Sequence, residues 1–326
     1  MTPGKAQVAV PTRPAPSVSI TTPSWNQGGF LEETIKSVLS QEGDFAIDYL
    51  LVDGGSTDNS VEVIKKYESL LLRGEWPVRC RDIRFRWLSE RDEGQSDAIN
   101  KGLGMSTGDI LAWLNSDDTY APGALRTVCE AFSQDADCDV VYGKAYYIDE
   151  SGARLGQYPT EDFCRERLAI VNFICQPSAF FRRAALECAG FPDASLRYVM
   201  DYDLWIRMAA ACRFRYLADF LSHYRLHGDS KTVSGEHALE NSRECLDVVY
   251  RHFHWAPANR VYEYCARWYQ AHVKDAGLKR KPIEFCLTAP YAAFKYCTMN
   301  RGIRLADVKQ LSLKNLRNLL VARNLY

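Results

Sequence analysis

Predicted strands and helices alternate four times over the first third of the chain. The strands are short runs rich in β-branched and other apolar residues, at 18–22, 49–52, 83–88 and 110–114. Between the first two, Leu31, Ile35 and Val38 recur at helical spacing. Such alternation is typical of a parallel sheet with helices on both faces. We therefore expect an α/β fold built on a mostly parallel sheet flanked by helices.

Acidic loops follow three of these strands. Asp53 follows the second strand, Asp92 the third, and Asp117 and Asp118 the fourth. Ligands of such sheets bind beyond the carboxyl ends of the strands, so these loops should open onto one edge. Asp117 and Asp118 raise each other's pKa because they carry like charges side by side. A hard divalent cation such as Mg²⁺ or Mn²⁺ would relieve that repulsion.

The chain divides into three parts by composition. Residues 1–16 contain four prolines and no periodicity, which predicts a disordered lead. Residues 17–234 form the predicted α/β domain, and residues 235–326 are helical in pattern and rich in aromatic side chains. Within the domain we expect further strands at 140–142, 144–148, 176–181, 214–217 and 222–226, and helices at 123–132 and 183–189 and from residue 201 on.

The formal net charge of −1 conceals a basic C-terminal stretch. From Lys274 to Tyr326 the chain carries 11 Lys or Arg against 3 Asp or Glu. One interpretation is that this stretch, which includes a predicted helix at 311–320, forms helices that only pack against the domain and expose their Lys and Arg to water. Alternatively, the basic surface rests on an anionic membrane, where each nearby cation contributes ~1 kcal/mol. Apolar and aromatic residues from Phe285 to Tyr296 would suit such a peripheral contact.

The eleven cysteines are scattered without closely spaced pairs. Several, such as Cys175, Cys212 and Cys286, lie in apolar contexts, so we expect reduced, mostly buried thiols. No apolar run approaches the ~20 residues that span a bilayer, and no signal peptide is evident. These features predict a cytoplasmic protein, peripheral at the inner face of the plasma membrane if the basic stretch binds lipid.

Six segments, in this order, resemble the family 2 glycosyltransferases, which are inverting enzymes with the GT-A fold. The segments are Val18–Asn26, Val52–Asp58, Gly94–Gly102, Gly108–Asp118, Met200–Arg207 and Tyr224–His227. The resemblance covers about two thirds of the chain, from Pro16 to Ser234. It implies a Rossmann-like GT-A domain with a helical C-terminal extension, and a nucleoside-diphosphate sugar as the donor.

The resemblance also implies which residues contact the donor. Asp53 matches the acidic residue that the family places on the base or ribose, and a carboxylate can accept hydrogen bonds from either. The loop with Pro23, Trp25 and Asn26 would cover the nucleoside, and Asp92 lies where the family often contacts the donor.

Asp117 and Asp118 match the family's metal site, where Mg²⁺ or Mn²⁺ stabilises the departing diphosphate. Asn115 stands where the first carboxylate of that motif often is, and it brings no charge. We therefore expect Asp118 to be the main metal ligand and Asp117 the second, with Asn115 and Asp117 also near the donor. His227 resembles a late residue that reaches back to the metal or the diphosphate.

Asp201 matches the catalytic base of the family's Glu-Asp motif, with Met200 in place of the Glu. Inversion requires one carboxylate to take the proton of the acceptor hydroxyl as its oxygen attacks the anomeric carbon. Asp203 is the competing candidate, but helix geometry turns it roughly 200° away from Asp201.

The sequence therefore predicts a metal-dependent inverting glycosyltransferase that moves a sugar from a nucleotide donor to a hydroxyl acceptor. A glycan or lipid-linked saccharide of cell-surface polysaccharide synthesis is the expected acceptor, and no nucleic-acid partner is expected. The alternative is a non-catalytic sugar-nucleotide-binding or scaffold protein that retains the fold. A nucleotidyltransferase would need a phosphate loop rich in glycine and lysine near the first strand, which the sequence lacks.

Overall fold

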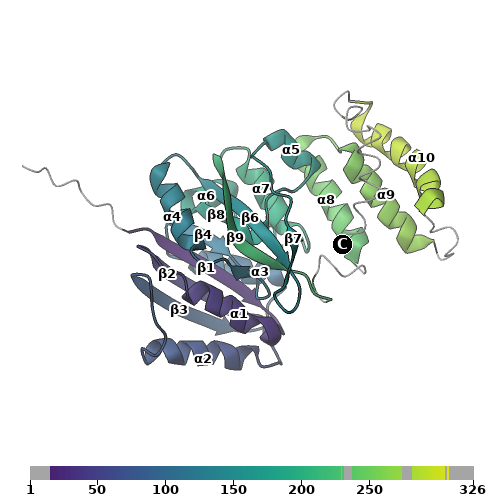
Figure 1. Ribbon diagram of the computed structural model, residues 1–326. Coiled ribbons are helices and arrows are strands. Elements are labelled where there is room, and N and C mark those ends of the chain that lie inside the picture. The colour runs from purple at the N-terminus through teal and green to yellow at the C-terminus, as the bar shows by residue number, and fades with distance from the viewer. Residues whose placement is uncertain (1–14, 229, 231–236, 274–280, 305–306, 308–326) are drawn as a thin grey trace, which may run out of the picture.

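The computed structural model describes residues 15–228, 230, 237–273, 281–304 and 307 (Figure 1). Its strands are β1 Ser17–Ser24, β2 Ala46–Asp53, β3 Asp82–Ser89, β4 Ile110–Trp113, β5 Thr119–Tyr120, β6 Val140–Ile148, β7 Arg154–Gln157, β8 Ala179–Arg182 and β9 Phe214–Arg225. Its helices are α1 Gly28–Leu39, α2 Ser60–Leu72, α3 Gln95–Met105, α4 Ala124–Gln134, α5 Arg165–Ile170, the 3-10 turn η1 Gln176–Ser178, α6 Arg183–Ala189, α7 Met200–Met208, α8 Ala238–Phe253, α9 Ala258–His272 and α10 Lys281–Asn300.

All nine of these strands join one sheet. Its order is β3-β2-β1-β4-β8-β6-β9-β5, and β7 pairs with β6. The four strands predicted from the alternating pattern are parallel neighbours. Beyond them β8 runs antiparallel to both β4 and β6, while β6 and β9 form a long parallel pair. The predicted α/β fold with a mostly parallel sheet is confirmed.

Five of the later strand predictions need correction. The predicted strands 140–142 and 144–148 are one strand, β6, which is irregular at Gly143 where its register with β9 shifts. The predicted strands 214–217 and 222–226 are likewise one strand, β9. The exposed Ala218 and Asp219 interrupt its apolar pattern at this irregularity. The predicted strand 176–181 begins with the turn η1, because Pro177 has no N–H to donate to a ladder.

Helices cover both faces of the sheet, and β4 shows this within four residues. Ile110 and Ala112 pack into the core under α1, α2 and α4. Leu111 and Trp113 point the other way, into the core formed with α3 and α7. Because successive side chains of a strand alternate between faces, an uninterrupted apolar run is what a strand buried on both sides requires. The loop after β4 is thereby held between two packed layers.

Helices α8, α9 and α10 lie beside the sheet and its helices at one end of the molecule (Figure 1). They share a small core that includes Leu246, Val261, Cys265 and Tyr296. None of the helices in the described residues is both long and apolar enough to cross a membrane. The predicted disordered lead and the predicted helix at 311–320 fall outside the described residues, apart from positions 15 and 16. The proposed domain boundaries at 17 and 234 stay predictions.

All eleven cysteines are free thiols, but fewer are buried than expected. Cys175 is buried, Cys212 is half-buried, and Cys286 is exposed on α10. The apolar neighbours of Cys286 suggested burial from the sequence. In the structure those neighbours are themselves exposed, so the whole outer side of α10 faces away from the core.

Candidate active site

A cavity of about 1620 Å³ opens beyond the carboxyl ends of β1, β2 and β4. Its wall includes Ser24 at the end of β1, Gly54 after β2 and Asn115 after β4, as the position of the acidic loops predicts. On the opposite side it is bounded by residues of α8, α9 and α10, such as Asn241 and Arg260. Cavities for single small ligands usually measure about 300–1,000 Å³. This one is large enough for two substrates.

The loop after β1 and the loop after β3 both contact the loop after β2 at one end of the cavity. Trp25 is largely exposed, and Asn26 adopts a left-handed conformation with φ of 52°. The side-chain oxygen of Asn26 accepts a hydrogen bond from the Thr57 backbone N–H at 2.8 Å. Asp92 lies so close to Gly54 that a Cβ on that glycine would be 2.6 Å from its carboxylate. Together with Pro23, these predicted donor residues line the cavity.

Asp53 lies beneath this end of the cavity and does not line it. Its carboxylate is fully buried and accepts hydrogen bonds from the backbone N–H groups of Gly55 and Ser56 and from the Ser89 hydroxyl, at 2.7–3.1 Å. These bonds fix the turn that presents Gly54. Asp53 therefore shapes the loop of the predicted donor site from below.

Asn115 is held by two glutamines that the sequence did not single out. Its Oδ1 accepts a hydrogen bond from Gln95 Nε2 at 2.8 Å, and its Nδ2 donates to Gln176 Oε1 at 3.2 Å. Gln176 also donates to the backbone carbonyl of Trp113 at 2.8 Å. All three polar side chains line the cavity. No sequence pattern indicates a role for Gln176 in the site, because only the folded sheet brings η1 next to β4.

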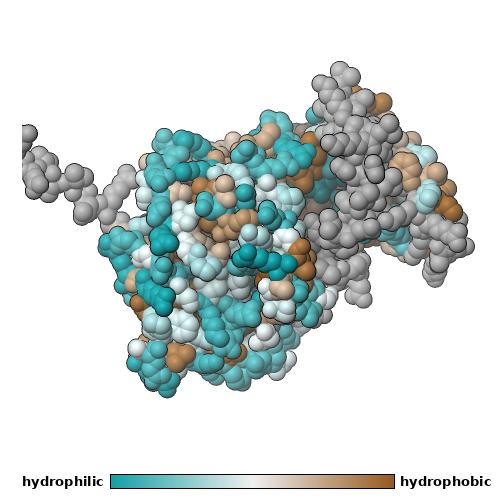
Figure 2. Space-filling model, in the orientation of Figure 1, coloured by the Kyte–Doolittle hydropathy of each residue, from teal (hydrophilic) through white to brown (hydrophobic). Residues whose placement is uncertain are grey.

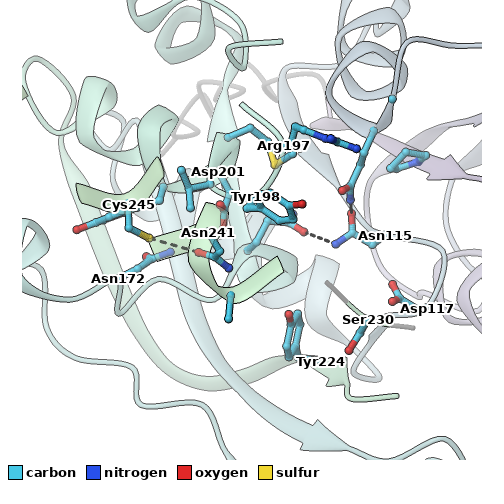
Figure 3. A pocket seen from close by; sticks show the side chains of 18 of the residues that line it. Asn115, Asp117, Asn172, Arg197, Tyr198, Asp201, Tyr224, Ser230, Asn241 and Cys245 are labelled. Atoms are coloured by element: carbon cyan, nitrogen blue, oxygen red, sulfur yellow. Dashed lines mark hydrogen bonds between the residues drawn. The ribbon is translucent and has the colours of Figure 1, made fainter. Parts of the chain in front are cut away.

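Asp117 and His227 meet at the cavity wall. Asp117 Oδ2 lies 3.0 Å from His227 Nε2, although 110 positions separate the two residues. The imidazole is buried against the ring of Phe30, whose centroid is 4.8 Å away. The Asp117 side chain keeps 21% of its surface exposed. The structure thus places one carboxylate and one imidazole together at the cavity wall, and Figure 3 shows Asp117 at this position.

Asp118 is buried and, unlike Asp117, does not line the cavity. Its Oδ1 accepts a hydrogen bond from the Arg225 backbone N–H at 2.9 Å, and its Oδ2 contacts Asn115 Nδ2 at 3.4 Å. Burial, and secondly the charge of Asp117, raise the pKa of Asp118 well above its ordinary value. The buried guanidinium of Arg225 donates to the Asp117 carbonyl at 2.8 Å. Arg225, which the sequence analysis left unassigned, therefore fastens this loop to β9.

Asp201 begins α7 and lines the cavity across from Asp117 (Figure 3). Around it lie Asn172, Asn241 and Cys245, which also line the cavity. Burial raises the pKa of Asp201 to about 6, against the opposing effect of hydrogen bonds with backbone groups. A carboxylate with a pKa near the working pH is suited to accept a proton and pass it on.

Asp203, the competing candidate, does not line the cavity. It is buried between Arg207 Nε at 2.7 Å and His252 Nε2 at 2.8 Å. Burial raises its pKa, but the hydrogen bonds from His252 and Arg207 outweigh burial and lower the pKa overall. Asp203 therefore ties α7 to α8, and Asp201 alone of the two faces the cavity.

Comparison with known proteins identifies the family. Residues 19–190, more than half of the chain, match the model of glycosyl transferase family 2. This chain belongs to that family. One relative, the PGL/p-HBAD biosynthesis glycosyltransferase of Mycobacterium bovis, is 30% identical over 231 residues, which cover 69% of this chain and 84% of the relative. Some relatives of this family 2 chain are much longer, and it matches only 21% of the length of chondroitin synthase from Pasteurella multocida.

Solved structures show the same fold. TarS 1–349 of S. aureus, in complex with UDP-GlcNAc, has a TM-score of 0.60 at 16% identity, over 94% of this chain and 87% of that one. The mannosyltransferase PcManGT of Pyrobaculum calidifontis, in complex with GDP-Man and Mn²⁺, has a TM-score of 0.52 at 15% identity, over 95% and 82%. The expected GT-A fold of this family 2 chain is thereby confirmed.

Proposed function

We propose that this family 2 chain is a metal-dependent inverting glycosyltransferase that moves a sugar from a nucleoside-diphosphate donor to a hydroxyl acceptor. One observation carries the proposal. A single cavity has the Asp117–His227 pair on one side and the partly buried carboxylate of Asp201 on the other. A group that holds the leaving diphosphate and a group that takes the acceptor proton must lie on opposite sides of the transferred sugar in an inverting reaction.

The nucleoside of the donor would lie at the end of the cavity formed by Pro23, Trp25 and Asn26. Asp92 and the backbone of Gly54 close this end from the other side. The carboxylate of Asp92 and the flat ring of Trp25 suit ribose hydroxyls and a base, respectively. The complexes of the structural neighbours with UDP-GlcNAc and GDP-Man support a nucleotide sugar as donor.

Asp117 and His227 would hold the cation. Carboxylate oxygen and imidazole nitrogen fit a divalent ion, and imidazole is a better ligand for Mn²⁺ than for Mg²⁺. The complex of PcManGT with Mn²⁺ supports this choice. When bound, the cation supplies Lewis-acid stabilisation of the departing diphosphate. No group of three or more His, Cys, Asp or Glu in the described part of the chain is arranged as a metal site, so the donor would supply further ligands.

The expected order of the metal ligands is reversed in this proposal. Asp117, and not Asp118, is the main carboxylate ligand, because Asp118 is buried and bonded to the Arg225 backbone. The oxygen of Asn115 is already taken by Gln95. Asp118 and Asn115 would instead hold the loop after β4 in the conformation that exposes Asp117 to the cavity.

Asp201 would act as the general base. Its carboxylate accepts the proton of the acceptor hydroxyl while the hydroxyl oxygen forms a bond to the anomeric carbon and the bond to the diphosphate breaks. The acceptor would lie on the side of the cavity bounded by α8 and α9, where Asn241 and Arg260 offer hydrogen-bond donors. We assign it to glycans or lipid-linked saccharides of surface polysaccharide synthesis, with the basic C-terminal region at the inner face of the membrane.

Release of nucleoside diphosphate from a panel of nucleotide sugars tests the proposal. Wild type with Mn²⁺ should hydrolyse at least one donor faster than background even without acceptor, because water can enter the large cavity. Adding EDTA should abolish this release. The same background with every donor, with and without Mn²⁺, would favour the non-catalytic binding protein instead.

A further inference from the structure

The outer side of α10 carries no charged side chain among the described residues. Its inner side is a stripe of buried side chains at every fourth position, formed by Glu284, Thr288, Ala292 and Tyr296. The exposed positions of the helix are Pro282, Ile283, Cys286, Leu287, Pro290, Tyr291, Ala293, Phe294, Cys297 and Thr298. A helix that faces water on one side normally carries charged residues there. This side is instead almost entirely apolar.

The most exposed of these side chains form one ridge. Ile283, Leu287, Tyr291 and Phe294 follow the i, i+4, i+8, i+11 spacing of a helix face and are 39–67% exposed. Trp268 of α9 continues the ridge, with its ring 6.1 Å from that of Tyr291. Apolar side chains gather at the end of the molecule that carries these two helices (Figure 2). A contiguous ridge of this kind marks an interaction surface.

We infer that the α9–α10 ridge docks on an anionic lipid surface. The residues that flank α10 in the sequence are basic, with Lys279 and Arg280 before it and Arg301 and Arg304 after it. Exposed Leu, Phe, Tyr and Trp side chains between basic residues are typical of helices that lie in the interface of a membrane. The apolar ridge would thus add to the proposed contact between the basic C-terminal residues and the membrane.

The same helix also bounds the cavity. Glu284 lines it from the inner side of α10 and accepts a hydrogen bond from Gln270 of α9 at 3.0 Å. Docking through the outer side would bring the acceptor side of the cavity next to the lipid. This part of the inference rests on the proposed function, and it favours an acceptor that is itself anchored in the membrane.

Vesicle flotation of the full chain tests the docking. Wild type should float with vesicles of phosphatidylcholine and phosphatidylglycerol, and Leu287→Ser with Phe294→Ser should reduce the partition coefficient at least about tenfold. Both residues are half-exposed or more, so the double variant should unfold at the wild-type temperature. The matched control replaces two exposed leucines outside α9 and α10, Leu72 of α2 and Leu155 of β7, by Ser and should float as wild type does.

Three outcomes would overturn the inference. Wild type that stays unbound excludes a lipid surface, and equal flotation of the two double variants excludes the ridge. Loss of a dimer in light scattering without loss of flotation would make the ridge a contact between two copies. Donor hydrolysis measured without vesicles should be the same in both double variants, so that a failure of docking is distinguishable from a failure of the proposed transfer.

Discussion

Replacing Asp201 by Asn lowers the rate of sugar transfer by about 10²–10⁴-fold, the usual contribution of a general base. The amide cannot accept the proton of the acceptor hydroxyl, whereas the Asp117–His227 pair stays intact, so donor affinity is unchanged. In wild type the rate should fall about tenfold per pH unit below the pKa of Asp201 of about 6. This acidic limb should be absent from the Asn variant.

Asp203→Asn is the matched control, two positions away on the same helix. It weakens the contacts with Arg207 and His252, and breaking a buried ion pair costs about 3–5 kcal/mol of unfolding free energy. Because both partners keep about a fifth of their surface exposed, we expect the low end of that range. The folded fraction should keep the acidic limb. If Asp203→Asn removed the limb and Asp201→Asn did not, the assignment of the base would be reversed.

Replacing His227 by Ala or Asp117 by Asn should weaken Mn²⁺ binding in the presence of UDP or GDP by at least about 10²-fold, because the first change removes one of the two proposed protein ligands and the second removes the charge of the other. Isothermal titration calorimetry of Mn²⁺ into the protein with each nucleotide measures this without requiring turnover. The loss should be larger for Mn²⁺ than for Mg²⁺ in His227→Ala.

His223→Ala provides the control for the metal experiment. His223 lies on the same strand as Arg225, contacts the Thr119 hydroxyl at 3.1 Å and does not line the cavity. It should bind Mn²⁺ as wild type does. Retention of full Mn²⁺ affinity in His227→Ala and Asp117→Asn, together with its loss in Asp118→Asn, would restore the ligand order expected from the sequence.

The sheet and its neighbouring helices could be predicted from sequence because their signals are local. Burial is visible within a few residues in the apolar run at 110–114. It is equally visible in the helical spacing of Leu31, Ile35 and Val38. The long strands β6 and β9 were predicted in pieces because Gly143 and Asp219 interrupt their patterns. A Cβ on Gly143 would be 2.7 Å from the Leu221 side chain, so the glycine is required by a contact that only the paired strands create.

Which of two neighbouring acidic residues lines the cavity could not be predicted in the same way. Asp117 and Asp118 are adjacent in sequence, and the direction of each carboxylate depends on Arg225 and His227, more than 100 positions away. Asp201 and Asp203 differ for the same reason, since His252 of α8 holds only the second. The motif locates the site, and tertiary contacts decide which member of each pair reaches the cavity.

The anomeric configuration of the released sugar tests the central claim most directly. With water as acceptor, proton NMR of the first minutes of donor hydrolysis distinguishes the two anomers before they equilibrate. Attack from the Asp201 side, opposite a diphosphate held at Asp117 and His227, predicts that an α-linked donor first releases the β-anomer. Initial release of the α-anomer would contradict the account.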